Sequence, residues 1–200
     1  MSLVVQIAHD YTCPWCYIAL FQAKKLKEQF DVEFDWVGYE MWPEELGWPE
    51  PSEPPAPSPR PRTPSRFELA MAAEGLDHPK IKVPRPNNMR IHNAMEAAEY
   101  AKTTGEFEAL NEKLYIAYWE QGRAIGEIDV ILELAEGIVK DLDALKAAMV
   151  EKKFNDKIIP FDDVAHEKGV WNVPTFFING GRFAEQPRVA LERALKNAIK

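Results

Sequence analysis

Cys13 and Cys16 are the only two cysteines of the chain, and only Pro14 and Trp15 separate them. An apolar run at 3–8 precedes the pair, and apolar residues at helical spacing follow it. A cysteine in the first turn of a helix meets unpaired backbone N–H groups and the positive end of the helix dipole, which favour the thiolate. The thiolate is the form that attacks disulfides and binds metals. We therefore predict that Cys13 is an exposed nucleophile of lowered pKa and that Cys16 is the shielded thiol that resolves a mixed disulfide.

A metal site is the other chemistry that two such cysteines suggest. Structural zinc takes four ligands, usually from a second cysteine pair or a histidine pair. This chain has no third cysteine, and its four histidines lack zinc-finger spacing. The pattern favours a redox centre without a metal. Pro14 supports it by fixing φ in the first helical turn, while Trp15 either grips an unfolded substrate or packs against a loop.

The elements that must position this pair are readable from the apolar periodicity. Residues 3–8 and 32–37 read as strands around a helix at 14–30, which together form a βαβ unit. Nine prolines at 43–64 exclude a helix there. Helical stripes follow from residue 65, including stretches at 142–149 and 154–165. A strand at 173–178, a hairpin turn at Asn179-Gly180, a return strand at 182–184 and a helix after Pro187 close the chain.

This order predicts an α/β fold in which a large all-helical domain is inserted. We expect one domain from 1–42 and 169–200, a proline-rich loop at 43–64 and the helical insertion at 65–168. The loop either hugs the surface or contacts a partner or second subunit, so a homodimer stays open.

Composition narrows the classes of partner. The net charge of −8 over 200 residues argues against a nucleic-acid binder. No stretch has the ~18 apolar residues of a membrane span, and the first residues lack signal-peptide features. We expect a cytoplasmic protein, a compartment in which paired cysteines are more often catalytic than structural.

Three segments, 11–18 (YTCPWCYI), 118–126 (YWEQGRAIG) and 169–176 (GVWNVPTF), carry a family resemblance. The chain resembles the thioredoxin-like DsbA-type oxidoreductases, and more closely the FrnE-like branch grouped with 2-hydroxychromene-2-carboxylate isomerases and kappa-class glutathione transferases. The resemblance implies a cis Pro174 beside the thiols and a Val173 backbone that binds an extended peptide or glutathione. It also implies that the helical insertion forms a lid over the site. His92, Asn88 and Tyr118 are candidates to face the cleft beneath this lid, and the alternative for each is a structural or surface role.

Three functions remain in competition at this point. The first is a thiol–disulfide oxidoreductase acting on protein or small-molecule disulfides, with no tightly bound cofactor. The second is a glutathione-dependent isomerase or transferase acting on an aromatic small molecule, although such relatives usually carry serine at the position of Cys13. The third is a binding protein that uses the proline-rich segment 43–64. His9 and Asp10 either tune the thiolate or form a hydrogen-bonded turn.

Overall fold

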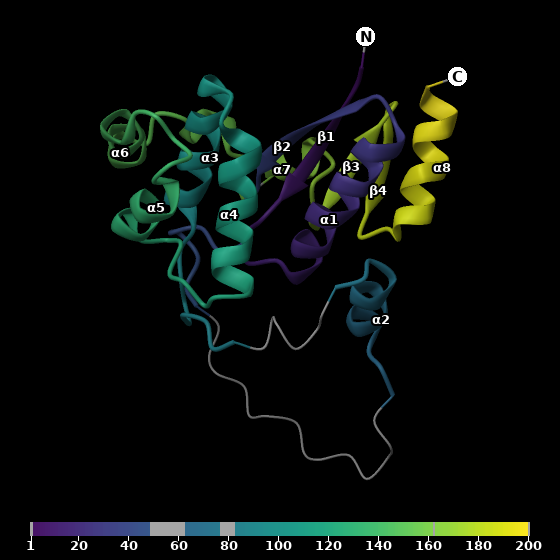
Figure 1. Ribbon diagram of the computed structural model, residues 1–200, viewed down its shortest axis with the longest axis horizontal. Helices are drawn as coiled ribbons and strands as arrows, with labels where there is room; N and C mark the ends of the chain where they lie inside the picture. Colours follow the sequence, from purple (N-terminus) through teal and green to yellow (C-terminus); the bar gives the residue numbers. More distant parts are fainter. Residues whose placement is uncertain (1, 49–62, 77–82, 162, 200) are drawn as a thin grey trace.

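The computed structural model describes residues 2–48, 63–76, 83–161 and 163–199. A single sheet and a group of helices make up these residues (Figure 1). The elements are β1 Leu3–His9, α1 Pro14–Gln29, β2 Val32–Gly38, α2 Arg66–Ala73, α3 His92–Thr104, α4 Phe107–Trp119, α5 Ile128–Ala135, α6 Leu142–Glu151, a 3₁₀ turn Asn155–Lys157, α7 Asp163–Glu167, β3 Thr175–Ile178, β4 Gly181–Ala184 and α8 Arg188–Ala198.

The sheet has the strand order β2-β1-β3-β4. β1 pairs in parallel with β2, and α1 makes the crossover between them. β3 is antiparallel to both β1 and β4. The predicted α/β class and the order βαβ, helices, ββα are confirmed. Because β1 and β2 are parallel, the ends of both strands lie at the same edge of the sheet, where the two cysteines follow β1.

Local signals account for the hairpin at the end of the chain. Asn179 and Gly180 have φ values of 47° and 76°, and a two-residue turn with positive φ at both positions matches the twist of the strands it joins. Ile178 consequently pairs with Gly181. Pro187 then precedes α8, as its position in the sequence predicts.

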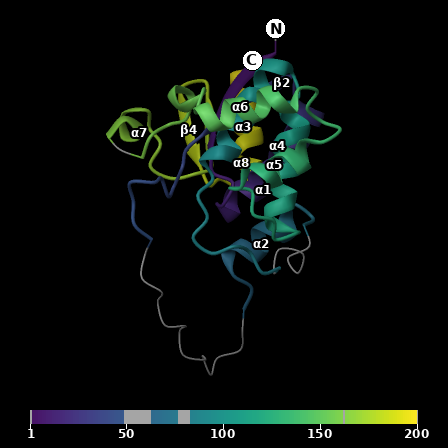
Figure 2. The ribbon, with the colours of Figure 1, turned by 90° about the vertical axis from the view of Figure 1, so that its left-hand side faces the viewer.

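The helices α3 to α6 pack on one another, while α1 packs against β2 and α8 packs against β3 (Figures 1 and 2). α1 also contacts α4 of the helical group. One hydrophobic core nevertheless runs from β1 through α1 into α4 and α5. Val5 and Ile7 of β1 are completely buried in this core, whereas Val4 and Gln6, which alternate with them, are exposed, as expected for successive strand residues that point to opposite faces. The shared core holds the helical group against the sheet edge, and the domain division at 42, 64 and 168 stays a prediction.

The helical prediction for residues 154–165 is wrong. A 3₁₀ turn ends at Lys157, and α7 starts only at Asp163. Between them the Ile159 N–H donates to the Gly38 carbonyl at 2.8 Å, which extends the edge of the sheet by one bridge to Tyr39. Pro160 follows and disfavours helical φ and ψ for the residue before it. Tertiary pairing therefore overrides the helical spacing in this segment.

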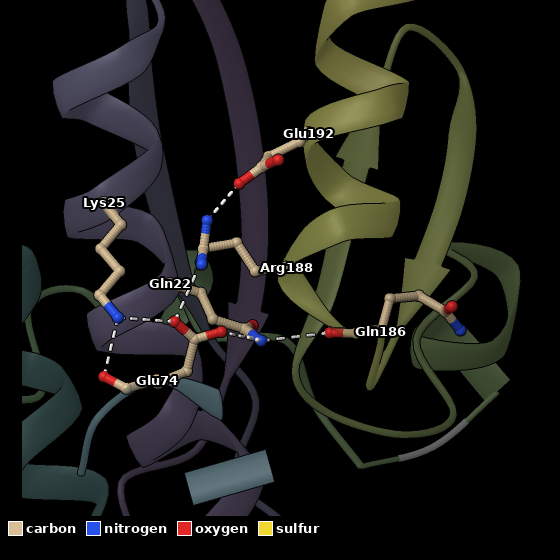
Figure 3. A network of polar contacts seen from close by, with 6 residues as sticks. All are labelled: Gln22, Lys25, Glu74, Gln186, Arg188 and Glu192. Atoms are coloured by element: carbon tan, nitrogen blue, oxygen red, sulfur yellow. Dashed lines mark hydrogen bonds and ion pairs between the residues drawn. The ribbon is translucent and has the colours of Figure 1, made fainter. Parts of the chain in front are cut away.

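A buried carboxylate fixes α2 beside the sheet domain (Figure 3). Glu74 directly follows α2, and its Oε2 accepts from Lys25 Nζ at 3.1 Å and Arg188 Nε at 3.0 Å. The Lys25 ammonium also donates to the Glu74 carbonyl at 2.7 Å, and Gln22 Nε2 bridges Glu74 and the Gln186 carbonyl. Because these partners come from α1 and from the start of α8, α2 is held against α1 rather than against the helical group.

Most of the proline-rich segment, residues 49–62, lies outside the described residues, so its predicted loop conformation stays a prediction. The first residues of the segment are described up to Trp48. Trp42 and Trp48 contact each other, with ring centroids 5.8 Å apart. Within the described ranges, no helix combines the length and apolar character that crossing a membrane requires.

Candidate active site

The two cysteines lie where β1 passes into α1. Cys13 is the N-cap of α1, with extended φ and ψ of −76° and 119°, and Pro14 occupies the first helical position. The Cys13 carbonyl accepts from the N–H groups of Cys16 and Tyr17 at 3.1 and 3.2 Å. Both cysteines are free thiols. The first turn of α1 thus places Cys13 at the helix end and Cys16 within it.

Cys13 is less exposed than the sequence predicts. Its exposed fraction is 4%, against 0% for Cys16. The prediction fails because the segments 39–42 and 171–173, which are distant in the sequence, pack around the first turn of α1 and wall a cavity of about 410 Å³. Cys13 lines this cavity, which gives a substrate a route to its sulfur.

The second wall of the site comes from the segment before β3. The Cys13 thiol donates to the Val173 carbonyl with an Sγ–O distance of 3.2 Å, although 160 residues separate the two. The Val173–Pro174 peptide bond is cis. Val173, Pro14 and Trp15 line the thiol cavity together with Cys13, whereas Pro174 is buried and its carbonyl accepts from the Glu185 N–H at 2.9 Å.

Burial controls the state of the second thiol. It raises the pKa of Cys16 well above its usual value, the hydrogen bond to Cys13 and the charge of Cys13 raise it further, and a backbone hydrogen bond at Asp10 opposes the shift. A thiol with a raised pKa stays protonated and is a poor nucleophile toward external disulfides. Of the two sulfurs, Cys16 is therefore suited to react only with a partner already bound at Cys13.

Asp10 is completely buried beside this pair. Its Oδ1 accepts from the Thr12 N–H and hydroxyl, both at 2.6 Å, and its Oδ2 accepts from the Met41 N–H at 2.8 Å. These bonds make the hydrogen-bonded turn and tie it to the segment after β2. Burial raises the pKa of Asp10 to about 6, despite the opposing hydrogen bonds.

His9 is buried and neutral. Its Nδ1 lies 2.8 Å from the Tyr115 hydroxyl of α4. Burial, and next the positive charge of Lys102, lower the pKa of His9 to about 3. The contact with Tyr115 joins the sheet to the helical group. Because the ring carries no charge at neutral pH, His9 supplies no cation to the thiols.

Four aromatic residues that sequence reasoning did not assign to the site line the cavity. Trp42 and Tyr39 follow β2, and Phe161 and Trp171 come from the segments around α7. No local signal in the sequence indicates that Trp42 and Trp171 line the same cavity as Cys13. Trp15, which the sequence did single out, lines the same cavity and contacts Phe67 of α2, with ring centroids 5.5 Å apart.

The three lid candidates do not line the thiol cavity. His92 instead lines a separate cavity of about 1060 Å³, where its Nδ1 is 3.2 Å from Glu40 and its Nε2 is 3.3 Å from Glu96. Tyr118 is buried beneath Arg85, and Asn88 is an exposed residue with a φ of 53°.

The chain belongs to the family of DSBA-like thioredoxin domains, which it matches over residues 4–196. This membership confirms the thioredoxin-like fold and the resemblance on which it was predicted. Members of this family include thiol–disulfide oxidoreductases, and related isomerases share the fold.

Three solved structures have the same fold. The probable DsbA oxidoreductase SCO1869 from Streptomyces coelicolor has a TM-score of 0.70 at 21% identity, covering 98% of this chain and 90% of that one. A 2-hydroxychromene-2-carboxylate isomerase has a TM-score of 0.67 at 15% identity, covering 98% and 95%. The cytosolic disulfide reductase DsbM from Pseudomonas aeruginosa has a TM-score of 0.63 at 18% identity, covering 98% and 100%. At these identities the likeness is one of fold.

Proposed function

We propose that the protein is a cytoplasmic thiol–disulfide oxidoreductase in which Cys13 attacks a disulfide and Cys16 resolves the mixed disulfide. The observation that carries the proposal is the arrangement of the two thiols. Cys13 is the N-cap of α1 and lines an open cavity, while Cys16 is completely buried one turn further on. Family membership supports the same chemistry.

The reaction follows from this arrangement. The Cys13 thiolate attacks one sulfur of the substrate, forms a mixed disulfide and releases the other sulfur as a thiolate, which takes up a proton. Cys16 then loses its proton and attacks the Cys13 sulfur, which releases the second substrate thiol and leaves a Cys13–Cys16 disulfide. Two electrons pass from the protein to the substrate, and an external dithiol returns them. Run in reverse, the same steps oxidise a substrate dithiol.

The neighbours of the thiols have supporting roles in this proposal. The Val173 carbonyl holds the Cys13 thiol toward the cavity through the 3.2 Å hydrogen bond, and an extended substrate bound along Val173 would meet the sulfur there. Pro14 leaves the first helical turn without an N–H that would need a partner. Pro174 fixes the direction of the chain after Val173 through the cis peptide bond, and Trp15 lines the cavity.

A glutathione-dependent isomerase or transferase is the second candidate, because an aromatic cavity beside a thiol suits an aromatic small molecule. It requires glutathione to bind and a Cys16 that contributes nothing to turnover. In the oxidoreductase, by contrast, turnover at the wild-type rate needs Cys16. The two candidates therefore make opposite predictions for the same variant.

Turnover of a protein disulfide with dithiothreitol as reductant tests the proposal. We expect Cys13→Ser to lower the rate to the uncatalysed background. Cys16→Ser, which removes the other thiol of the same helical turn, should slow turnover without abolishing it, because dithiothreitol must then resolve the mixed disulfide in place of Cys16. Wild-type turnover by Cys13→Ser would contradict the proposal, and wild-type turnover by Cys16→Ser would favour the isomerase or transferase.

A further inference from the structure

His92 and two buried glutamates form a polar cluster at the larger cavity of about 1060 Å³, hereafter the His92 cavity. Glu40 and His92 line this cavity, and Glu96 contacts His92. His92 Nδ1 lies 3.2 Å from Glu40 Oε2, and its Nε2 lies 3.3 Å from Glu96 Oε1. The exposed fractions of Glu40 and Glu96 are 6% and 0%. Carboxylates buried to this extent normally have partners that balance their charge and fill their hydrogen bonds.

The protein supplies too few donors for these two carboxylates. Glu40 Oε2 contacts His92 Nδ1, and Glu96 Oε2 accepts from the Phe154 N–H at 2.8 Å. Within the described ranges, the buried atoms Glu40 Oε1, Glu96 Oε1 and His92 Nε2 have no hydrogen-bond partner. Buried polar atoms without a partner are rare in proteins, and each one calls for a group that could satisfy it.

One imidazolium cannot balance two carboxylates. The hydrogen bond to Glu40 raises the pKa of His92, although burial opposes this shift, so the charged ring is favoured. Burial raises the pKa of Glu96 despite the Phe154 N–H and His92, which both act in the other direction. With all three groups charged, one positive charge faces two negative charges. A ligand ammonium would bring the missing positive charge together with three N–H donors.

Two of the cations that line the His92 cavity already have partners in the protein. Arg90 donates to the Trp42 carbonyl at 2.7 Å and to the Leu46 carbonyl at 2.5 Å. Lys152 Nζ lies 3.7 Å from a Glu44 carboxylate oxygen. The charge of Lys152 acts only weakly on the cluster, since it is the last of the influences on the pKa of His92.

The remaining charged residues of the lining are exposed. Lys168 is the third cation, and Glu45 and Asp156 are carboxylates at the solvent side. Together with Glu40 and Glu44, carboxylates outnumber lysines and arginines in the lining. The buried end of the cavity is therefore acidic, and its exposed rim is of mixed charge.

Apolar side chains complete the His92 cavity. They come mainly from the segment between α6 and α7, and they are Ile158, Ile159, Pro160 and Phe161. A volume of about 1060 Å³ lies at the upper end of the range for small-molecule sites. Such sites combine apolar walls with a few fixed polar groups, as this one does. Leu46 and Phe161 also line the thiol cavity, so the two cavities are neighbours.

We propose that the His92 cavity binds a small molecule that combines a protonated amine with an apolar body. The ammonium group donates to the Glu40 carboxylate in a charge-assisted hydrogen bond, and the apolar body lies against Ile159 and Phe161. Because Glu40 Oε1 is buried, binding includes a rotation of this side chain, a change that is common on ligand binding. This site is additional to the disulfide exchange at Cys13 and does not depend on it.

Matched probes that differ in one group test the ligand class. 2-Phenylethylamine, 2-phenylethanol and 3-phenylpropanoate carry the same ring with an ammonium, a hydroxyl or a carboxylate group, and each is titrated into the full chain by calorimetry at about pH 7.5, where the amine is protonated. We expect the amine to bind at least about tenfold more tightly than the alcohol and the carboxylate to bind most weakly. Zinc chloride is a further probe, because histidine and glutamate also ligate zinc.

A variant connects the amine preference to this cavity. Glu40→Gln should weaken binding of the amine about tenfold and leave binding of the alcohol unchanged, since only the ammonium uses the charge of Glu40. Glu28→Gln removes one carboxylate at an exposed position of α1, so it is the matched control and should bind all probes like the wild type. Amide shifts in the ¹⁵N spectrum of the wild type should change around 90–96 and 158–161 on addition of the amine.

Each outcome decides the proposal. Equal affinities for the amine and the alcohol, or tighter binding of the carboxylate, would overturn the ligand class without any variant. Amine affinity that Glu40→Gln leaves unchanged, or shifts confined to other segments, would overturn the site. Zinc binding that is lost in Glu40→Gln, with no binding of the amine to the wild type, would overturn the proposal in favour of a metal site. None of these results bears on whether Cys13 exchanges disulfides, which the Cys13→Ser turnover assay tests separately.

Discussion

Replacing Asp10 by asparagine should remove a specific part of the pH dependence of stability. Asp10 is completely buried, and its pKa rises from 3.8 to about 6 on folding. A carboxyl group with a raised pKa binds its proton more tightly in the folded protein, so its contribution is fully present below pH 3.8 and is lost as the pH rises through about 6. At 1.36 kcal/mol per pKa unit, this shift corresponds to about 3 kcal/mol in total.

Most of this change falls in a range where urea unfolding can be measured. Between about pH 4.5 and about pH 7.5 the wild type should lose about 2 kcal/mol of unfolding free energy relative to Asp10→Asn. The asparagine variant should be less stable at the acidic end, because its amide cannot accept the Met41 N–H that Asp10 Oδ2 accepts at 2.8 Å. Asp31→Asn, at an exposed position, is the matched control and should run parallel to the wild type. A constant difference between wild type and Asp10→Asn across this range would refute the reasoning.

Two further substitutions test how the elements around the site are held. Glu74→Gln should lower the free energy of unfolding by about 2 kcal/mol, since it leaves two cations without their buried carboxylate, and should lower the Tm by about 4–8 °C. Glu112→Gln, the control, removes a carboxylate from an exposed ion pair and should change the Tm little. Equal Tm shifts for the two variants would contradict this reasoning. Gly126→Ala should cost about 3 kcal/mol in urea unfolding, because the new Cβ would lie 2.1 Å from the Arg90 carbonyl oxygen. Gly47→Ala, the control, has open space at its Cβ and should leave the free energy of unfolding unchanged. A Gly126→Ala protein as stable as the wild type would contradict the prediction and show that the Arg90 backbone moves away from the new Cβ.

The parts of the site that depend on local sequence could be predicted. The apolar periodicity changes around Cys13 and Cys16, which indicates a strand-to-helix junction there. Pro14 marks the first helical position. The hairpin at Asn179 and Gly180 likewise needs only its own two residues, both of which adopt positive φ. In each case the signal and the structure lie within the same few residues.

The parts formed by long-range packing could not be predicted. Nothing in the sequence around Trp171 indicates that it meets Trp42 beside Cys13, or that Arg182 stacks on it at 3.9 Å. The near-complete burial of Cys13 has the same origin. Asp10 is a polar residue after an apolar strand, and only the packing of neighbouring elements makes its carboxyl fully buried.

Trapping the mixed disulfide tests the central claim, that Cys13 attacks and Cys16 resolves, most directly. Cys16→Ser is mixed with a peptide disulfide, and intact mass spectrometry with peptide mapping identifies the product. We predict a one-to-one covalent adduct joined through Cys13, whereas the wild type under the same conditions should lose two hydrogens and carry an internal Cys13–Cys16 disulfide. The absence of an adduct on Cys16→Ser, or an equally rapid adduct through Cys16 on Cys13→Ser, would contradict this account.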